Sequence, residues 1–134
     1  MNNESLNICI LAAGKGTRMN SDMPKVLHEI NNKPIIHFVI EKSLSLNPDT
    51  TILIIGYKKE LVKQSVKNFD IKFAYQNKQK GTAHAIEQCI DHLKTHTGDT
   101  LILSGDVPLI SVKTLSKFIN IHRGNKSLAS IISA

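Results

Sequence analysis

Short apolar runs alternate along the chain with longer stretches in which apolar residues recur every three or four positions. Three of these runs, Leu6–Leu11, Thr51–Ile55 and Thr100–Leu103, have the length and the aliphatic composition of buried strands. Ile71–Gln76 alternates enough to form another strand, and Ser127–Ala134 has the composition of a fifth. The pattern therefore predicts strands at these five places.

Helical spacing marks the segments that separate the strands. Such spacing is found in four stretches: 33–46, 57–69, the segment that begins at Gly81, and the segment that follows Ser111. We expect Pro34 to lie in the first turn of its helix and Thr82 to cap the start of the third helix. Because strands alternate with helices, the sequence predicts an α/β fold: a Rossmann-like three-layer sandwich whose mainly parallel sheet carries helices on both faces.

Ligands of open parallel sheets bind beyond the carboxyl ends of the strands. This rule selects four segments of the sequence: 12–19, 56–57, 76–82 and 104–106. In the first segment, two alanines and Gly14 leave room for a nucleotide to lie against the main chain, and Gly16 can adopt backbone angles closed to other residues. We therefore expect segment 12–19 to cradle phosphate groups.

Three cations accompany this loop: Lys15, Arg18 and Lys25. Spacing excludes two better-known phosphate motifs, because the dinucleotide fingerprint needs a third glycine and the Walker motif needs a glycine four residues before Gly-Lys-Ser/Thr. A glycine turn that only links a strand to a helix is the alternative interpretation. The clustered cations and small residues favour a phosphate loop.

The stretch LAAGKGTRM, residues 11–19, followed by Pro24 and Lys25, resembles the opening of the sugar-1-phosphate nucleotidyltransferases, above all those that use UTP and N-acetylglucosamine 1-phosphate. The resemblance runs from about Leu6 to Ala134. It implies transfer of UMP from UTP to the sugar 1-phosphate, release of pyrophosphate, and Mg²⁺ as cofactor. It also implies that 1–134 is the N-terminal part of a uridylyltransferase domain, with an incomplete sheet and without the family's acetyltransferase β-helix domain.

The resemblance assigns roles to individual residues. Arg18 would clamp the leaving pyrophosphate, and Lys25 would neutralise the reacting phosphates. The residues expected to bind the nucleotide are Leu11, Ala12, Ala13, Gly14, Gly16, Gln76, Gly81, Thr82, Ser104 and Gly105. In the family, the residues that bind the sugar and a second metal ligand, an asparagine, lie beyond the last residue of this chain.

Asp106 follows an apolar strand and precedes Pro108, so its carboxylate would stand at the mouth of that strand. Mg²⁺ binds one or two carboxylates together with substrate phosphates. The residues alone leave open whether Asp106 binds a metal or only starts the turn before Pro108. The stretch SGDVPL, residues 104–109, resembles the metal-binding segment of the family, with Ser104 where its members commonly carry an aromatic or small residue. The resemblance therefore favours a metal at Asp106.

The amide of Gln76 both donates and accepts hydrogen bonds, which suits the imide edge of uracil; a polar loop residue without that role is the alternative. Segment 79–85 resembles the base-recognition turn of the family. We expect His84, inside this turn, to be packed or solvent-facing rather than catalytic. His92 and His96 are four residues apart, but no cysteine or carboxylate joins them, so we expect no zinc site.

With 134 residues the chain makes one domain. Its net charge of +6, from 17 Lys and Arg against 11 Asp and Glu, favours anionic partners. Nucleic acid is not expected among them, because the lysines are spread along the chain and there is no tryptophan. The sequence shows no leader segment and no apolar run of about 18 residues, so we expect a cytoplasmic protein without a membrane partner.

Cys9 and Cys89 fall on apolar positions and should be buried free thiols. We also expect the chain to self-associate through uncovered apolar surface. Two other functions stay open at this point. One is a relative that uses another base or acceptor, and the other is a nucleotide-binding module without catalytic activity.

Overall fold

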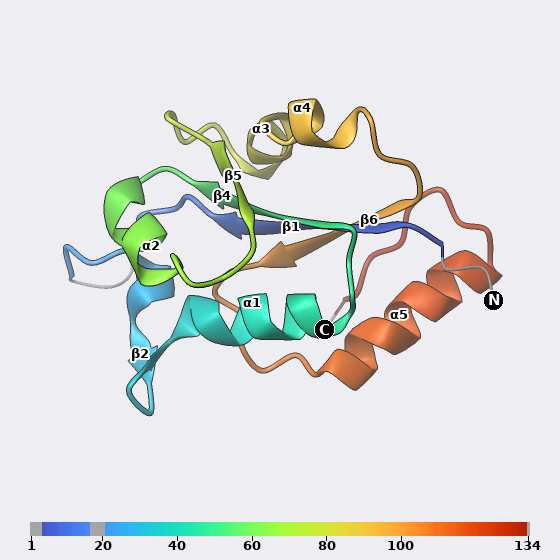
Figure 1. The fold of residues 1–134 in the computed structure, drawn as a ribbon, viewed down its shortest axis with the longest axis horizontal. Coiled ribbons are helices and arrows are strands. Elements are labelled where there is room, and N and C mark those ends of the chain that lie inside the picture. Colours follow the sequence, from blue (N-terminus) through green and yellow to red (C-terminus); the bar gives the residue numbers. More distant parts are fainter. Residues whose placement is uncertain (1–3, 17–20, 134) are drawn as a thin grey trace.

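The computed structural model describes residues 4–16 and 21–133 of the chain. Within them, four strands form one parallel sheet in the order β5-β4-β1-β6 (Figure 1). These strands are β1 (Leu6–Ala12), β4 (Thr50–Ile55), β5 (Lys72–Tyr75) and β6 (Asp99–Ser104). The chain passes from β1 to β4 and β5 on one side and then crosses to β6 on the other, so the strand order reverses next to β1. Open α/β sheets bind their ligands at such a reversal.

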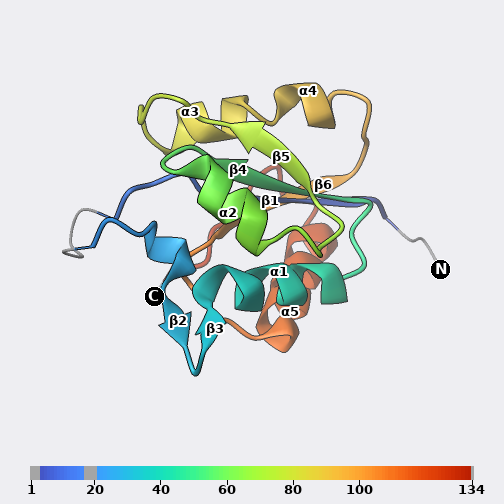
Figure 2. The same ribbon diagram turned by 60° about the vertical axis from the view of Figure 1, so that its left-hand side comes forward.

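Helices cover both faces of the sheet, and the two views show three layers (Figures 1 and 2). One face carries α1 (Ile35–Ser45), α2 (Lys59–Ser65) and α5 (Val112–Gly124). The other carries α3 (Thr82–Glu87) and α4 (Ile90–Leu93). The 3-10 helix η1 (Lys25–Leu27) and the antiparallel pair β2 (Glu29–Ile30) and β3 (Lys33–Pro34) precede α1. The predicted α/β three-layer fold is confirmed.

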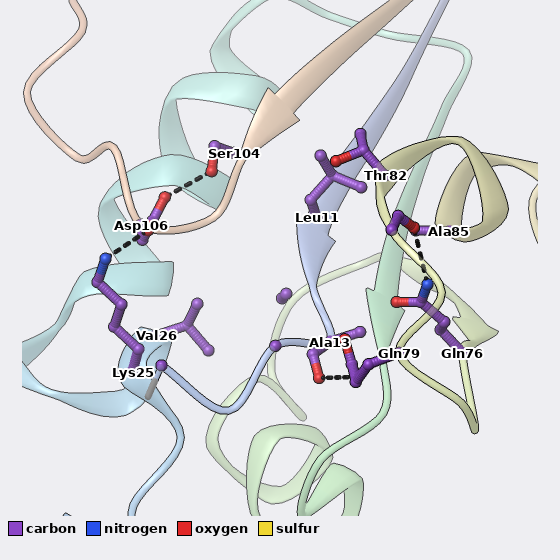
Figure 3. A pocket seen from close by; sticks show the side chains of 14 residues that line it. Leu11, Ala13, Lys25, Val26, Gln76, Gln79, Thr82, Ala85, Ser104 and Asp106 are labelled. Atoms are coloured by element: carbon purple, nitrogen blue, oxygen red, sulfur yellow. Dashed lines mark hydrogen bonds and ion pairs between the residues drawn. The ribbon is translucent and has the colours of Figure 1, made fainter. Parts of the chain in front are cut away.

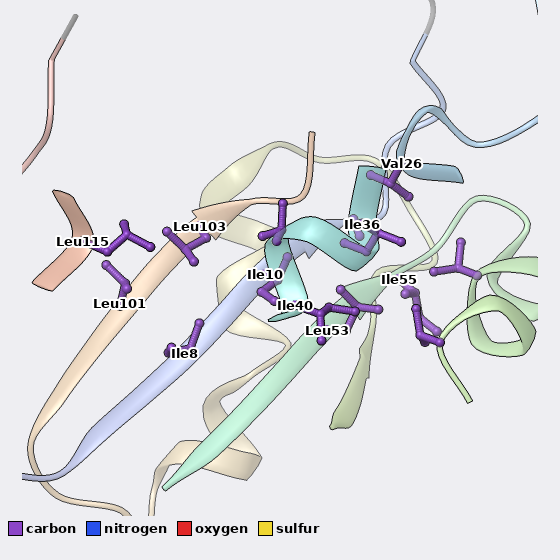
Figure 4. Packing of buried hydrophobic residues seen from close by; sticks show 14 of the residues in the cluster. Ile8, Ile10, Val26, Ile36, Ile40, Leu53, Ile55, Leu101, Leu103 and Leu115 are labelled. Atoms are coloured by element: carbon purple, nitrogen blue, oxygen red, sulfur yellow. The ribbon is translucent and has the colours of Figure 1, made fainter. Parts of the chain in front are cut away.

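Alternate residues of the strands build the core beneath α1 and α5. Ile10 of β1 pairs in register with Leu53 of β4 and Leu103 of β6, and Ile36 and Ile40 of α1 belong to the same cluster (Figure 4). Ile10, Leu53 and Ile36 are completely buried. Full burial of such a side chain contributes roughly 1.5–3 kcal/mol to the free energy of folding. The centre of the sheet therefore stabilises the fold, and the residues available for binding lie at the strand ends.

Small residues pack the opposite face of the sheet. Cys9, Ala74, Ala85 and Cys89 are all buried there, which lets α3 lie close to the strands. Both cysteines are free and buried, as predicted. None of the helices in the described ranges combines the length and apolarity that a membrane span requires.

Three expectations about helix ends are wrong. The helix after Gly81 is not continuous, because the N–H groups of Gln88 and Cys89 bond to carbonyls only three residues back, and α4 begins separately at Ile90. Gly81 rather than Thr82 is the N-cap of α3, with a φ of +94°, and no side chain caps that end. Pro34 lies just before the first residue of α1 rather than within its first turn.

The last predicted strand does not form in the described residues. Over 127–133 the chain carries no strand, and it is fastened to the end of α5 instead. The Ser127 N–H donates to the His122 carbonyl at 3.2 Å, and Ser130 Oγ lies 2.9 Å from His122 Nδ1. The side chain of Leu128 is fully exposed, and β6 forms an edge of the described sheet.

Candidate functional site

A pocket of about 450 Å³ opens where the strand order reverses, at the carboxyl ends of β1 and β6 (Figure 3). The loop after β1 forms its floor, η1 and the end of β6 form one wall, and the turn between β5 and α3 forms the opposite wall. The residues that line it are Leu11, Ala12, Ala13, Gly14, Gly16, Lys25, Val26, Gln76, Gln79, Gly81, Thr82, Ala85, Ser104 and Asp106.

The loop after β1 is held close to its neighbours by its small residues. A Cβ atom added at Gly16, whose φ is +74°, would lie 2.7 Å from the Cβ of Lys25, so only glycine lets the loop return onto η1. The carbonyl of Ala13 accepts two hydrogen bonds, one from the Tyr57 N–H at 3.1 Å and one from Gln79 Nε2 at 2.7 Å. The floor of the pocket is thereby tied to β4 and to the β5–α3 turn.

One wall of the pocket carries a pair of opposite charges. Lys25 Nζ donates to Asp106 Oδ2 at 2.7 Å, and the Ser104 hydroxyl donates to the other carboxylate oxygen. These two donors, Lys25 first, hold the pKa of the Asp106 carboxyl below its usual range. The carboxylate therefore remains ionised at neutral pH and faces the pocket with a cation beside it.

Gly105 explains how this wall comes so close to β1. Its N–H donates to the Leu11 carbonyl at 2.8 Å, and an added Cβ would lie 2.7 Å from that same oxygen. Only a residue without a side chain allows the main chains to approach in this way. Gly105 is buried behind the wall and does not line the pocket.

The opposite wall depends on Gln76. Its side chain is 3% exposed, and Nε2 donates to the Gly81 carbonyl at 3.0 Å and lies 3.1 Å from His84 Nδ1. The amide thus fixes the shape of the turn that leads into α3. Gly81 and Thr82 present that turn to the pocket from the N-terminal end of α3.

The pocket offers few ligands to a metal ion. No group of three or more His, Cys, Asp or Glu side chains gathers anywhere in residues 4–16 and 21–133. Mg²⁺ needs no such group, because it takes one or two carboxylates and completes its shell with water and substrate phosphates. The Asp106 carboxylate with the Ser104 hydroxyl beside it therefore fits Mg²⁺, whereas His92, whose Nε2 lies 3.0 Å from the Phe73 carbonyl, is engaged elsewhere.

Residues 8–133 match the profile of the MobA-like NTP transferase domain. The match covers nearly the whole chain. This chain belongs to the MobA-like NTP transferase family.

Curated relatives of this transferase domain include proteins named bifunctional protein GlmU. The chain is 42% identical over 127 residues to the protein of Trichormus variabilis and 44% identical over 128 residues to that of Gloeothece citriformis. Each alignment covers 95% of this chain and 28% of the relative. The chain therefore spans little more than a quarter of the length of these relatives.

Solved structures similar to the domain share its fold at lower identity. Rv0371c of Mycobacterium tuberculosis H37Rv has a TM-score of 0.77 at 18% identity, over 92% of this chain and 63% of that one. HddC of Yersinia pseudotuberculosis, solved in complex with GMP-PN, has a TM-score of 0.72 at 25% identity, over 87% and 53% of the two chains. These similarities support the nucleotidyltransferase fold of the sheet and its helices.

Most of the residues expected to form the transferase site surround the one pocket. They are Leu11, Ala12, Ala13, Gly14, Gly16, Lys25, Gln76, Gly81, Thr82, Ser104 and Asp106. Gly105 is buried behind them, and Arg18 lies outside the described residues. The structure thus brings together residues that are up to 95 positions apart in the sequence, Leu11 and Asp106, while the role of each residue stays a prediction.

Three residues that line the pocket of this transferase were assigned no individual role from the sequence: Val26, Gln79 and Ala85. Ala85 belongs to the segment 79–85 that resembles the base-recognition turn and lies three residues after Thr82 in α3, so helical spacing with a small side chain could have indicated its role. Gln79 stands in a turn that the sequence marked, but its bond to the Ala13 carbonyl depends on how that turn folds. Nothing in the sequence around Val26 signals its place at the pocket.

Proposed function

We propose that this chain binds UTP and forms the nucleotide-binding part of an enzyme that transfers UMP to N-acetylglucosamine 1-phosphate, giving UDP-N-acetylglucosamine and pyrophosphate. The observation that carries the proposal is the division of the pocket into two ends. A turn built by Gln76 and Gly81 faces a charged pair, Lys25 and Asp106, across a floor of small residues. The similarity to the GlmU proteins over 95% of the chain supports it.

In this proposal the base lies at the turn and the phosphates lie at the charged wall. The main chain of residues 11–14 holds the nucleoside at close range, because Ala12 and Ala13 have small side chains and Gly14 has none. The edge of uracil is read by the polar groups of the 76–82 turn. The triphosphate would extend across the floor of the pocket, from the turn toward the charged wall.

Lys25 and Asp106 have complementary tasks at the phosphate end. The Lys25 ammonium neutralises phosphate oxygens, and Arg18 is proposed to clamp the pyrophosphate as it leaves. Asp106, with Ser104, would hold Mg²⁺, which when bound adds positive charge among the phosphate oxygens. Lys25 and Arg18 would stabilise directly the negative charge that spreads over the phosphoryl group in the transition state, and Asp106 would do so only through the cation that it holds.

The reaction needs no covalent enzyme intermediate. A phosphate oxygen of the sugar 1-phosphate forms a bond to the α-phosphorus of UTP, and the bond from that phosphorus to the pyrophosphate oxygen breaks. Positioning of the two reactants in line supplies much of the rate, since well-oriented groups gain roughly 7–11 kcal/mol over a bimolecular encounter. We further propose that the product serves cell-wall precursor synthesis in the cytoplasm.

Nucleotide-selective thermal stabilisation tests the proposal. UTP with MgCl₂ should raise the melting temperature of the chain more than ATP, GTP or CTP does, because the 76–82 turn recognises uracil. At 100 times its dissociation constant, a ligand adds about 2.7 kcal/mol to the free energy of unfolding. Equal shifts with all four nucleotides would remove the uridine assignment, and a preference for another base would favour a relative with a different substrate.

Two variants at glutamine positions sharpen the experiment. Gln76→Leu removes the bond to the Gly81 carbonyl, so the preference for UTP should disappear. Gln64→Leu is the matched control, because Gln64 is exposed on α2 and does not line the pocket. If both variants keep the same preference as the unmodified chain, Gln76 does not contribute to base selection.

A further inference from the structure

Tyr57 touches the glycine-rich loop on both of its described flanks. It follows Gly56 at the carboxyl end of β4, and its N–H donates to the Ala13 carbonyl at 3.1 Å. The Tyr57 hydroxyl donates to the Asp22 carbonyl at 3.3 Å, and the Lys15 ammonium lies 5.5 Å from the centre of the ring. Tyr57 therefore contacts Ala13 through its main chain, and Lys15 and Asp22 through its side chain.

The backbone on both sides of Tyr57 is tightly constrained. A Cβ atom added at Gly56 would lie 2.3 Å from the carbonyl oxygen of Gln76, so the turn is pressed against the neighbouring strand. The next residue, Lys58, has a φ of +46°, in the left-handed region that most residues avoid. A sharp turn between β4 and α2 thus presents the ring to the loop.

The ring of Tyr57 gathers positive charge at the rim of the pocket. Lys15 stands between Gly14 and Gly16, which both line the pocket, and the Lys58 ammonium lies 5.6 Å from the same ring. In residues 4–16 and 21–133, no carboxylate lies within ion-pair distance of either ammonium. Both ammonium groups lie within 5.6 Å of the centre of one ring, and neither pairs with a carboxylate among the described residues, so both can attract an anion.

We propose that Tyr57 is a positioning residue for the phosphate chain of the nucleotide. Its ring holds the Lys15 ammonium at the pocket rim, and its hydroxyl fixes the segment at Asp22 on the other side of the loop. The inference rests on the proposed function of the pocket, because it takes the outer phosphates of UTP as the ligand. An exposed contact between a cation and a ring has a small effect, so we expect a two- to fivefold change in affinity.

Binding of UTP and of UMP, each with MgCl₂, measured by calorimetry on this chain, tests the role of the ring. Tyr57→Leu should weaken UTP by roughly two- to fivefold and leave UMP unchanged, since UMP lacks the outer phosphates. Tyr57→Phe keeps the ring and should bind UTP within about twofold of the unmodified chain. Tyr75→Leu is the matched control, because its ring contacts Lys59 at 5.3 Å and does not line the pocket.

A double variant tests whether the ring acts through Lys15. Lys15→Met should weaken UTP about as much as Tyr57→Leu does, and the double variant should be no weaker than the single ones. Additive losses would show that Tyr57 and Lys15 act independently, which overturns the inference. An equal loss of UTP and UMP in Tyr57→Leu would overturn it as well, because it would indicate a general disturbance of the pocket.

Amide hydrogen exchange provides a readout that needs no nucleotide. The amide of residue 57, which donates to the Ala13 carbonyl, should lose protection in Tyr57→Leu and keep it in Tyr75→Leu. Unchanged exchange in Tyr57→Leu would refute the positioning role even if UTP binds. Failure of the unmodified chain to bind UTP would refute the proposed function instead, and the exchange rates would still decide whether Tyr57 holds the loop.

Discussion

At the scale of single residues, the ion pair between Lys25 and Asp106 contributes little to folding stability but places two opposite charges at the pocket. The side chains are 41% and 30% exposed, so water screens their attraction, and such a pair contributes at most about 1 kcal/mol to stability. Their position in the pocket has the larger consequence for binding. A phosphate of a ligand can pair with the Lys25 ammonium in place of Asp106, and a metal ion can bind the Asp106 carboxylate in place of Lys25.

Replacement of Asp106 by asparagine separates these two effects. Asp106→Asn should abolish the dependence of UTP affinity on Mg²⁺, because a neutral amide is a poor ligand for a hard cation. The free energy of unfolding should fall by no more than about 1 kcal/mol. Calorimetric titration with and without MgCl₂ measures the first quantity, and urea unfolding measures the second.

Asp91→Asn provides the matched control for this variant. Asp91 also pairs with a lysine, Lys94 at 2.9 Å, but its side chain is 88% exposed and lies away from the pocket. This control should keep the Mg²⁺ dependence of the unmodified chain. If Asp106→Asn keeps it too, Asp106 is a turn residue and the metal interpretation is wrong.

The pH dependence of stability reports on the same carboxylate. The hydrogen bonds from Lys25 and then Ser104 lower the pKa of Asp106 in the folded chain, so its stabilising contribution is complete above its ordinary value of 3.8. That contribution is lost as the pH falls through the folded pKa. The difference in unfolding free energy between the unmodified chain and Asp106→Asn should therefore be constant near neutral pH and vanish in acid. A difference that grows in acid would contradict the assignment.

Sequence reasoning found pocket residues where a residue type limits the backbone or carries charge. Gly16, Gly81 and Asp106 each lie in a segment that follows a predicted strand, where few roles other than ligand binding explain a glycine or an aspartate. It could not find Val26, because a buried valine has the same appearance in the sequence wherever it packs. The hydrogen bond of Gln76 to the Gly81 carbonyl was also beyond reach, since it depends on the path of a turn.

At the scale of elements, the approach of β6 to β1 shapes the charged wall. Gly105→Ala should destabilise the chain by about 1–3 kcal/mol, because the new methyl group meets the Leu11 carbonyl and atoms of Ile36 and Val26 at 2.7–3.3 Å. Chemical denaturation monitored by circular dichroism measures this loss. UTP affinity should fall in the same variant, since the end of β6 must move away from β1.

Gly124→Ala is the control for the glycine substitution. Gly124 is the last residue of α5, and an added methyl group there meets nothing within 4 Å. Alanine costs less conformational entropy than glycine in a helix, so this variant should be as stable as the unmodified chain or more stable by up to about 1 kcal/mol. An unaltered stability of Gly105→Ala would mean that the two strand ends can separate freely.

The strands were easier to predict than the helix ends. β1 and β4 are short apolar runs buried on both faces, β6 is an apolar run buried on one face, and burial leaves these patterns in the sequence. The break between α3 and α4 arises from a few backbone hydrogen bonds that the residue types do not predict. The segment 127–133 has strand composition, but a strand needs a partner, and in the described chain its polar groups meet the end of α5 instead.

At the scale of the whole molecule, apolar surface gathers along the β6 edge and the following segments. Ile102 on β6 is 46% exposed, and Ile131 in the last segment is 89% exposed. Edge strands with exposed apolar side chains pair readily with other chains. We therefore expect the chain to self-associate as its concentration rises.

Sedimentation velocity over a range of concentrations tests this expectation. Ile102→Lys should shift the chain toward monomer, because a charge on the edge opposes strand pairing. Ile90→Lys is the control, since Ile90 is also exposed but lies on α4 rather than on an edge strand. A monomer at every concentration in the unmodified chain would refute the prediction.

The parallel direction of β1, β4, β5 and β6 has an evolutionary consequence. All segments that follow the carboxyl ends of these strands leave the sheet on the same side. The side chains that hold the sheet together, such as Ile10 and Leu53, do not line the pocket. Mutations in the 76–82 turn can therefore alter which ligand is held while the interior stays the same. Substitutions there can change the ligand preference of the domain, and their effect on stability is confined to the turn.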